Sequence, residues 1–94
     1  MREKQMELPK NENAKKLFVK LFVKAVNQDG PFSPVSLFAE DIKDYDDVAV
    51  AQALSLLLQY CVVYRSGPLA GKWHRNSFTI QKYKEGYYRK YGIT

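Results

Sequence analysis

Residues 61–80, CVVYRSGPLAGKWHRNSFTI, decide the fold, because the helical spacing of apolar residues earlier in the chain gives way here to strand-like alternation. The β-branched and aromatic residues of 61–65 predict a strand. Two glycines and a proline within 66–71 predict a turn. Residues 72–80 alternate again, with Trp73 pointing to one side and His74 to the other, and predict a second strand. The stretch therefore predicts a β-hairpin.

A long helix is expected well before this hairpin. From Asn11 onward, apolar residues recur at spacings of three and four. Asn11 or Asn13 can cap its first turn, and Asp29-Gly30 supplies a stop. Its inward residues are expected to be Ala14, Leu17, Phe18, Leu21, Phe22, Ala25 and Val26.

Two shorter helices are expected to follow. Ser33-Pro34 suits an N-cap and a first helical residue, and this helix is expected to end near Lys43. The next helix runs to about Tyr60, with Asp44 or Asp46 as its cap. Apolar residues at helical spacing are expected to face inward: Val35, Leu37, Phe38 and Ile42 in the first of these, and Val50, Ala51, Leu54, Leu57 and Leu58 in the second.

The size of the chain suits one small domain. Its 94 residues are 46% hydrophobic and 14% aromatic, enough for a core of its own. Residues 1–10 are charged and polar without a period and predict a flexible arm, so the domain is expected to span 11–94. Cys61, the only cysteine, is expected to be a buried, reduced thiol. With no leader-like or membrane-length apolar stretch, a cytoplasmic protein is expected.

Charge is sorted along the chain. Residues 1–24 carry a balance of +4, residues 25–60 a balance of −5 and residues 61–94 a balance of +6. The C-terminal block interleaves its cations with Trp73, His74 and several tyrosines. A basic region beside an acidic centre gives a dipolar surface with a preferred face for a polyanion, and cations mixed with aromatic rings suit contact with nucleic acid.

The order of long helix, extended link, short helix, third helix and hairpin resembles a winged helix-turn-helix domain, an α+β fold that is mostly helical. The resemblance spans about 11–80, with the last helix as an appendage. It implies duplex DNA binding, with the third helix in the major groove and the hairpin, called the wing, against the backbone or minor groove. Carried over to this chain, it implies DNA contacts from Lys43, Gln52, Ser55, Arg65, Lys72, His74 and Arg75.

One departure from that pattern concerns the third helix. Its outward positions are expected to be Asp46, Asp47, Ala49, Gln52, Ser55, Leu56 and Gln59, without Arg or Lys. Two aspartates at its start repel phosphate by about 1 kcal/mol each at an effective dielectric of about 20. Three possibilities stay open. The helix uses its uncharged middle, or the hairpin and terminal helix do most of the binding, or the domain binds a protein instead of DNA.

A homodimer is also expected. The tandem unit LFVKLFVK over 17–24 makes the first helix apolar on more of its surface than a surface helix needs, so Val19 and Val23 either pack within the fold or meet a second copy. The last helix is expected over 81–91, where Tyr83, Tyr87 and Tyr91 lie one turn apart and serve packing or a dimer.

Other chemistry finds little support in the sequence. One histidine and one cysteine without placed partners predict no metal site, no cofactor and no catalytic centre. Trp73 either anchors the hairpin or stacks on a base. The first hypothesis is therefore a dimeric duplex-DNA-binding protein, acting as a transcriptional regulator or a plasmid or viral maintenance factor. The alternative is a protein-interaction module that docks through the first helix, Leu56 and the acidic edge 40–47.

Overall fold

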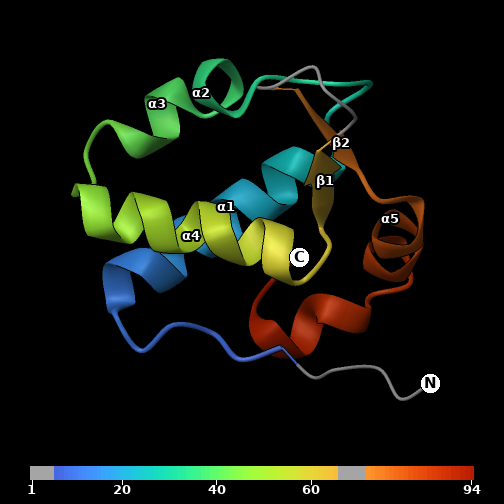
Figure 1. Ribbon diagram of the computed structural model, residues 1–94. Coiled ribbons are helices and arrows are strands. Elements are labelled where there is room, and N and C mark those ends of the chain that lie inside the picture. The colour runs from blue at the N-terminus through green and yellow to red at the C-terminus, as the bar shows by residue number, and fades with distance from the viewer. Residues whose placement is uncertain (1–5, 66–71) are drawn as a thin grey trace.

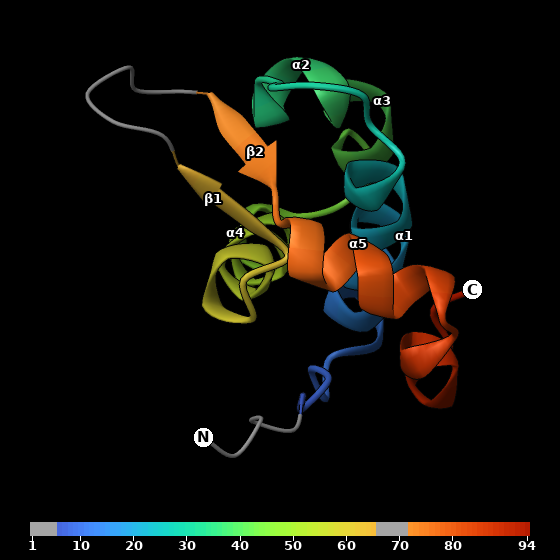
Figure 2. The same ribbon diagram turned by 90° about the vertical axis from the view of Figure 1, so that its right-hand side faces the viewer.

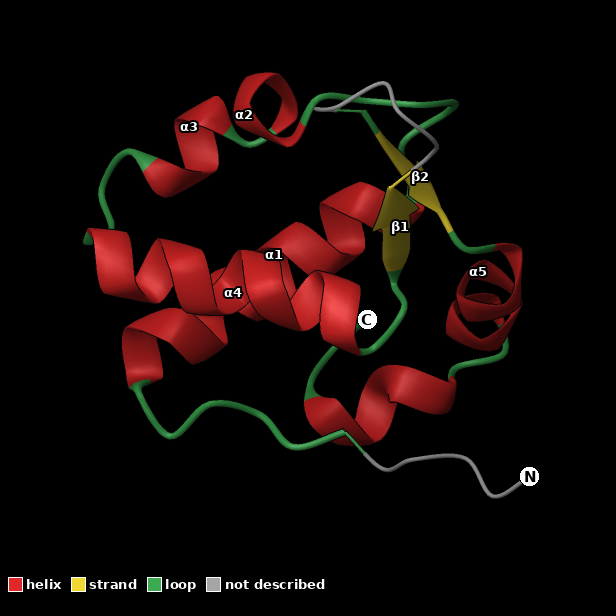
Figure 3. Cartoon of the chain, in the orientation of Figure 1, coloured by secondary structure: helices red, strands yellow, loops and turns green. Residues whose placement is uncertain are grey.

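The computed structural model describes residues 6–65 and 72–94. Most of these residues are helical, and a two-stranded antiparallel hairpin lies at one corner (Figure 3). The expected α+β, mostly helical class is confirmed. None of the helices among the described residues is long and apolar enough to cross a membrane.

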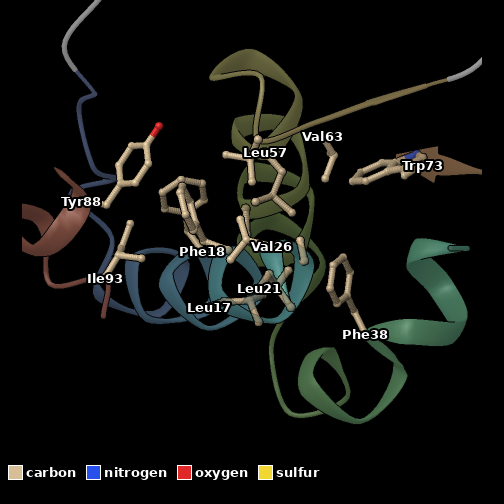
Figure 4. Packing of buried hydrophobic residues seen from close by; sticks show 14 of the residues in the cluster. Leu17, Phe18, Leu21, Val26, Phe38, Leu57, Val63, Trp73, Tyr88 and Ile93 are labelled. Atoms are coloured by element: carbon tan, nitrogen blue, oxygen red, sulfur yellow. The ribbon is translucent and has the colours of Figure 1, made fainter. Parts of the chain in front are cut away.

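Helix α1 (Glu12–Val26) is the centre of the molecule. Asn11 caps it, since its Oδ1 accepts from the backbone N–H groups of Asn13 at 2.9 Å and Ala14 at 3.2 Å. All seven residues expected to face inward are buried. Helix α4 packs on one side of α1, and α5 crosses it on another (Figure 2). Because α1 is covered on several sides, its broad apolar surface is largely used within one chain (Figure 4).

The expected second helix is divided into α2 (Pro34–Leu37) and α3 (Ala39–Ile42). The division falls at Phe38, which is fully buried and packs its ring edge-on against Phe32 with 5.7 Å between centroids. Pro34 stands at the start of α2 as predicted. The expectation that Val35 faces inward is wrong, because 72% of it is exposed.

Helix α4 (Asp47–Gln59) begins at the expected cap, where the Asp46 carboxylate accepts from the Ala49 N–H at 2.8 Å. Its buried residues are Ala49, Ala53 and Leu57. Two of the three are alanines, and α4 packs along α1. The sequence-based assignment was therefore wrong at two positions: Ala49 lies inward, and Ala51 is exposed.

The hairpin consists of β1 (Val63–Arg65) and β2 (Trp73–Arg75), with Tyr64 opposite His74. The predicted turn at 66–71 lies outside the described residues. Trp73 also forms a bridge to Phe32, with N–O distances of 2.9 and 2.7 Å, which fastens the link between α1 and α2 to the hairpin. Trp73 is 5% exposed and so anchors the hairpin to the domain, the first of its two predicted roles.

The C-terminal segment differs from the prediction of a strand to residue 80 and one helix over 81–91. Helix α5 (Ser77–Lys84) begins directly after β2, because the Asn76 Oδ1 accepts from the Phe78 N–H at 2.9 Å and caps it. Gly86, with φ of 82°, ends this helix, and the 3₁₀ helix η1 (Tyr87–Tyr91) follows.

The two ends of the described chain meet on the body of the domain. Met6 is 8% exposed and its N–H donates to the Tyr91 hydroxyl at 3.3 Å, while the Glu7 N–H donates to Tyr60 at 3.0 Å. Residues 6–9 of the expected arm therefore pack on the domain, and residues 1–5 lie outside the described residues. Ile93 is 1% exposed and lies beside the ring of Tyr88 (Figure 4).

Candidate nucleic-acid interface

The hairpin presents two faces of different chemistry. Val63 and Trp73 are buried, so the face that they share with Arg65 turns toward the domain. Tyr64 and His74 lie on the opposite face. Their rings stack with 5.3 Å between centroids and 19° between planes, and Tyr64 is 52% exposed. The outer face therefore carries an accessible aromatic surface.

Two predicted phosphate contacts lie exposed on this hairpin. Arg65 ends β1, and Lys72 directly precedes β2, so both flank the segment 66–71. With His74, they form what we call the hairpin cations and rings: Tyr64, Arg65, Lys72 and His74. Sequence reasoning had identified three of these four. The exposed ring of Tyr64 was missed, although its alternation with buried Val63 could have indicated it.

Arg75 is placed differently from the other predicted contacts. Its Nη1 donates to the Val26 carbonyl at 3.0 Å, and its Nη2 lies 3.8 Å from the Asp29 carboxylate. The Val26 carbonyl belongs to the last turn of α1, where carbonyl groups lack partners within the helix. Arg75 thus caps α1 in the structure, and its side chain is 33% exposed.

The outward surface of α4 holds the predicted base-contacting residues. Gln52 and Ser55 are both exposed, and with Val48, Ala51 and Gln59 they form a stripe without charge. Val48 is 71% exposed. Lys43 lies before this helix, where its Nζ is 2.8 Å from the Glu40 carboxylate, so it is not gathered with the hairpin cations.

Charge is segregated in space as well as in sequence. The acidic residues gather where α3 leads into α4, and we call this the acidic end: Glu40, Asp41, Asp44, Asp46 and Asp47. The C-terminal cations lie on α5 and η1: Lys82, Lys84, Arg89 and Lys90. Figure 1 places the junction of α3 and α4 across the molecule from α5. The acidic end and the C-terminal cations therefore lie on opposite sides of the domain, although Lys24 of α1 pairs with Asp41 at 2.8 Å.

The residues predicted for a dimer make contacts within one chain. Val19 and Val23 are half-buried against the core. Tyr83 lies 6.3 Å from the ring of Phe22, and its hydroxyl donates to the Thr94 carbonyl at 3.0 Å. Tyr91 accepts from the Met6 N–H.

Tyr87 is also held within the chain, since it lies beneath the ammonium groups of Lys82 at 4.1 Å and Lys90 at 4.6 Å. Tyr83 and Tyr91 do not continue one helical row with it, because Gly86 separates α5 from η1. The dimer stays a prediction.

No cluster of three His, Cys, Asp or Glu side chains that could hold a metal ion occurs within residues 6–65 and 72–94. Comparison of the chain with protein-family models, curated proteins and solved structures finds no match.

Proposed function

We propose that this chain is a winged helix-turn-helix domain that binds duplex DNA chiefly through phosphate contacts of its hairpin. The order of α1, the α2–α3 pair, α4 and the hairpin supports the fold, as does the bridge between Phe32 and Trp73. A regulator of transcription or a maintenance factor fits such a small basic domain.

The observation that carries the proposal is an anchored hairpin with exposed Arg65 and Lys72 on either side of the segment 66–71 and the stacked rings of Tyr64 and His74 on its outer face. Arg65 and Lys72 can each neutralise a phosphate, and the stacked pair of Tyr64 and His74 offers a face for a sugar or base. The buried Trp73 anchors the hairpin that carries these residues. Arg75 is left out of the interface because it caps α1.

Helix α4 has a secondary part in the proposal. Its exposed stripe, which includes Gln52 and Ser55, is neutral, and a Gln amide can pair with the edge of adenine. The acidic end lies at the beginning of the same helix and disfavours close approach to phosphate there. Affinity is therefore expected to come from the hairpin and the C-terminal cations, with limited sequence reading by α4.

The salt dependence of duplex binding tests this proposal. If about four phosphates are neutralised, log affinity should fall against log salt with a slope on the order of −4. Replacing both Arg65 and Lys72 by Gln should flatten the slope by about 2 and weaken binding about tenfold or more at moderate salt. Fluorescence anisotropy with a random duplex between 0.05 and about 0.2 M salt measures both effects.

A matched variant removes the same charge elsewhere. Lys10 and Lys16 are exposed and lie at the start of α1, while the hairpin lies near its other end (Figure 1). Their replacement by Gln should flatten the slope by less than about 1. The proposal would be contradicted if the two double variants lost equal amounts of duplex affinity and salt slope, or if the unaltered protein bound no duplex at low salt.

One observation favours the rival function, a protein-interaction module. Val35 on α2 and Val48 on α4 are large apolar side chains with 72% and 71% of their surface exposed. Under the rival, Val48→Ser abolishes capture of a partner protein, and the double replacement of Arg65 and Lys72 leaves it intact. Under the proposal, Val48→Ser changes duplex affinity less than about twofold, because a neutral side chain neutralises no phosphate.

A further inference from the structure

A hollow of about 220 Å³ opens where the end of α4, the start of α5, η1 and the N-terminal segment meet. Residues from all four contribute to its wall, among them Met6, Tyr60, Cys61, Phe78, Tyr87 and Tyr91. Four of these six are aromatic. The hollow lies apart from the hairpin cations and rings, none of which lines it.

Several polar groups in the wall are already bonded to the protein. The Tyr60 hydroxyl accepts from the Glu7 N–H at 3.0 Å, and the Tyr91 hydroxyl accepts from the Met6 N–H at 3.3 Å. The Thr79 hydroxyl donates to the Cys61 carbonyl at 3.0 Å. These bonds hold Tyr60, Tyr91 and Thr79 in place, and most of the remaining wall is aromatic or apolar. A planar apolar group suits such a wall.

Two cations lie against the rings of this wall. The Lys82 Nζ is 4.1 Å from the ring centroid of Tyr87 and 5.2 Å from that of Phe78. The Lys90 Nζ is 4.6 Å from Tyr87 and 5.3 Å from Tyr91. Neither lysine lines the hollow itself, but Tyr87 lies between the hollow and both ammonium groups. An anionic group in contact with the Tyr87 ring is therefore roughly one Debye length, about 8 Å, from both. None of the described lining residues is acidic, so the local charge favours an anion.

We propose that this hollow binds a small aromatic anion, with its ring between the tyrosines and its carboxylate toward Lys82 and Lys90. The volume limits the ligand, because it is below the roughly 300–1,000 Å³ usual for drug-sized molecules. One or two fused rings fit that limit. The site shares Lys82 and Lys90 with the C-terminal cations of the proposed DNA interface, but binding of the small anion does not require DNA.

Cys61 provides a direct readout. It lines the hollow, it is exposed, and it is the only cysteine of the chain. Alkylation by N-ethylmaleimide, a small neutral reagent, can be followed by mass spectrometry with and without 1-naphthoate. Saturating 1-naphthoate should slow alkylation at least about fivefold, because an occupant of the hollow covers the thiol. The uncharged 1-naphthamide at the same concentration should slow it less than about twofold.

A pair of double variants tests the role of the two lysines. Lys82→Gln with Lys90→Gln removes one cation from α5 and one from η1 beside the hollow, and should raise the Kd of 1-naphthoate about tenfold. Lys84→Gln with Arg89→Gln removes the same number of cations from the same two elements. Because the cations that contact the rings of the wall are Lys82 and Lys90, this control pair should change the Kd less than about twofold. For each variant, the rate of Cys61 alkylation with 1-naphthoate is compared with the rate of the same variant without it.

Three outcomes would overturn the inference: no protection by 1-naphthoate, equal protection by the amide, or equal losses in the two double variants. The first two are measured on the unaltered protein and do not depend on any variant folding. No nucleic acid is present in the assay, so its failure leaves the proposed DNA binding untouched, and the reverse also holds.

Discussion

At the scale of single residues, Arg65 on β1 and Arg75 on β2 show how the same side chain acquires different roles at opposite ends of a short hairpin. Both lie on the inward face of the hairpin. Arg75 reaches the end of α1, where it donates to the Val26 carbonyl and faces Asp29. Arg65 lies farther along the hairpin and is exposed. The distance of each arginine from the end of α1, more than its residue type, therefore determines whether it caps a helix or is exposed for binding.

The stability of two alanine variants should reveal this difference. Arg75→Ala removes a charged hydrogen bond to the end of a helix and should lower the free energy of unfolding by about 1–2 kcal/mol. Arg65→Ala should change it by less than about 0.5 kcal/mol, as is usual for an exposed residue. Urea denaturation with equal m-values measures both. Equal effects of the two substitutions would mean that the contacts of Arg75 contribute nothing to folding.

Residues that act locally were the ones that sequence could identify. Asn11 and Asp46 cap their helices as expected, because a cap depends on a bond to a backbone N–H two or three residues away. The partner of Arg75 lies 49 residues distant in the chain, and no local pattern encodes it. The same holds for the hollow, whose wall joins segments from both ends of the chain. The charges of the candidate interface were thus predictable, and its tertiary partners were not.

At the scale of elements, the segment after α4 explains why Cys61 is not buried. Its N–H donates to the Leu58 carbonyl at 3.1 Å, and the N–H of Val62 donates to the Leu57 carbonyl at 2.9 Å. This pair of bonds forms a Schellman motif, which needs a left-handed residue after the helix. Cys61 takes that conformation with φ of 57° and turns outward. The expectation of a buried thiol was wrong because Cys61 takes the left-handed position after the end of α4 and does not continue the apolar face of the helix.

Replacing Cys61 by glycine should therefore stabilise the domain. A non-glycine residue with positive φ costs about 1–2 kcal/mol, and the greater freedom of glycine in the unfolded chain offsets about half of the gain. The expected net effect is a rise of about 1 kcal/mol in the free energy of unfolding, measured by urea denaturation. Cys61→Ala keeps the strain and should leave stability nearly unchanged. A gain from alanine as large as that from glycine would contradict this account of the helix end.

The boundary between β2 and α5 was misplaced for a related reason. Residues 72–80 alternate throughout, yet only Trp73–Arg75 form a strand. Asn76 caps α5, and the buried Thr79 bonds to the Cys61 carbonyl beside the end of α4. A short alternation of apolar residues is compatible with a strand or with a helix. Here the cap at Asn76 and the packing of α5 on α1 favour the helix.

At the scale of the whole molecule, the separation of charge determines how a polyanion can approach. The acidic end lies at the junction of α3 and α4, and the C-terminal cations lie on α5 and η1 (Figures 1 and 2). The molecule extends 33 Å along its longest axis, about four Debye lengths at physiological salt. Because Figure 1 places α5 across the molecule from the acidic end, a duplex held by the hairpin and α5 should feel the acidic charges less than one held by the start of α4.

The double replacement of Asp44 and Asp47 by Asn distinguishes these two orientations. Asp46 is kept because it caps α4. If the hairpin and C-terminal cations bind the duplex, the Kd at about 0.15 M salt should change less than twofold. The removed charges then lie farther than about one Debye length from the duplex, so that salt screens them. If the start of α4 enters the groove, each aspartate costs about 1 kcal/mol, and the variant should bind about 30-fold more tightly. Anisotropy at two salt concentrations separates the two orientations. If the aspartates are remote, their replacement should change the Kd more at low salt, where the Debye length is longer. If they contact the duplex, the change in Kd should already be large at moderate salt.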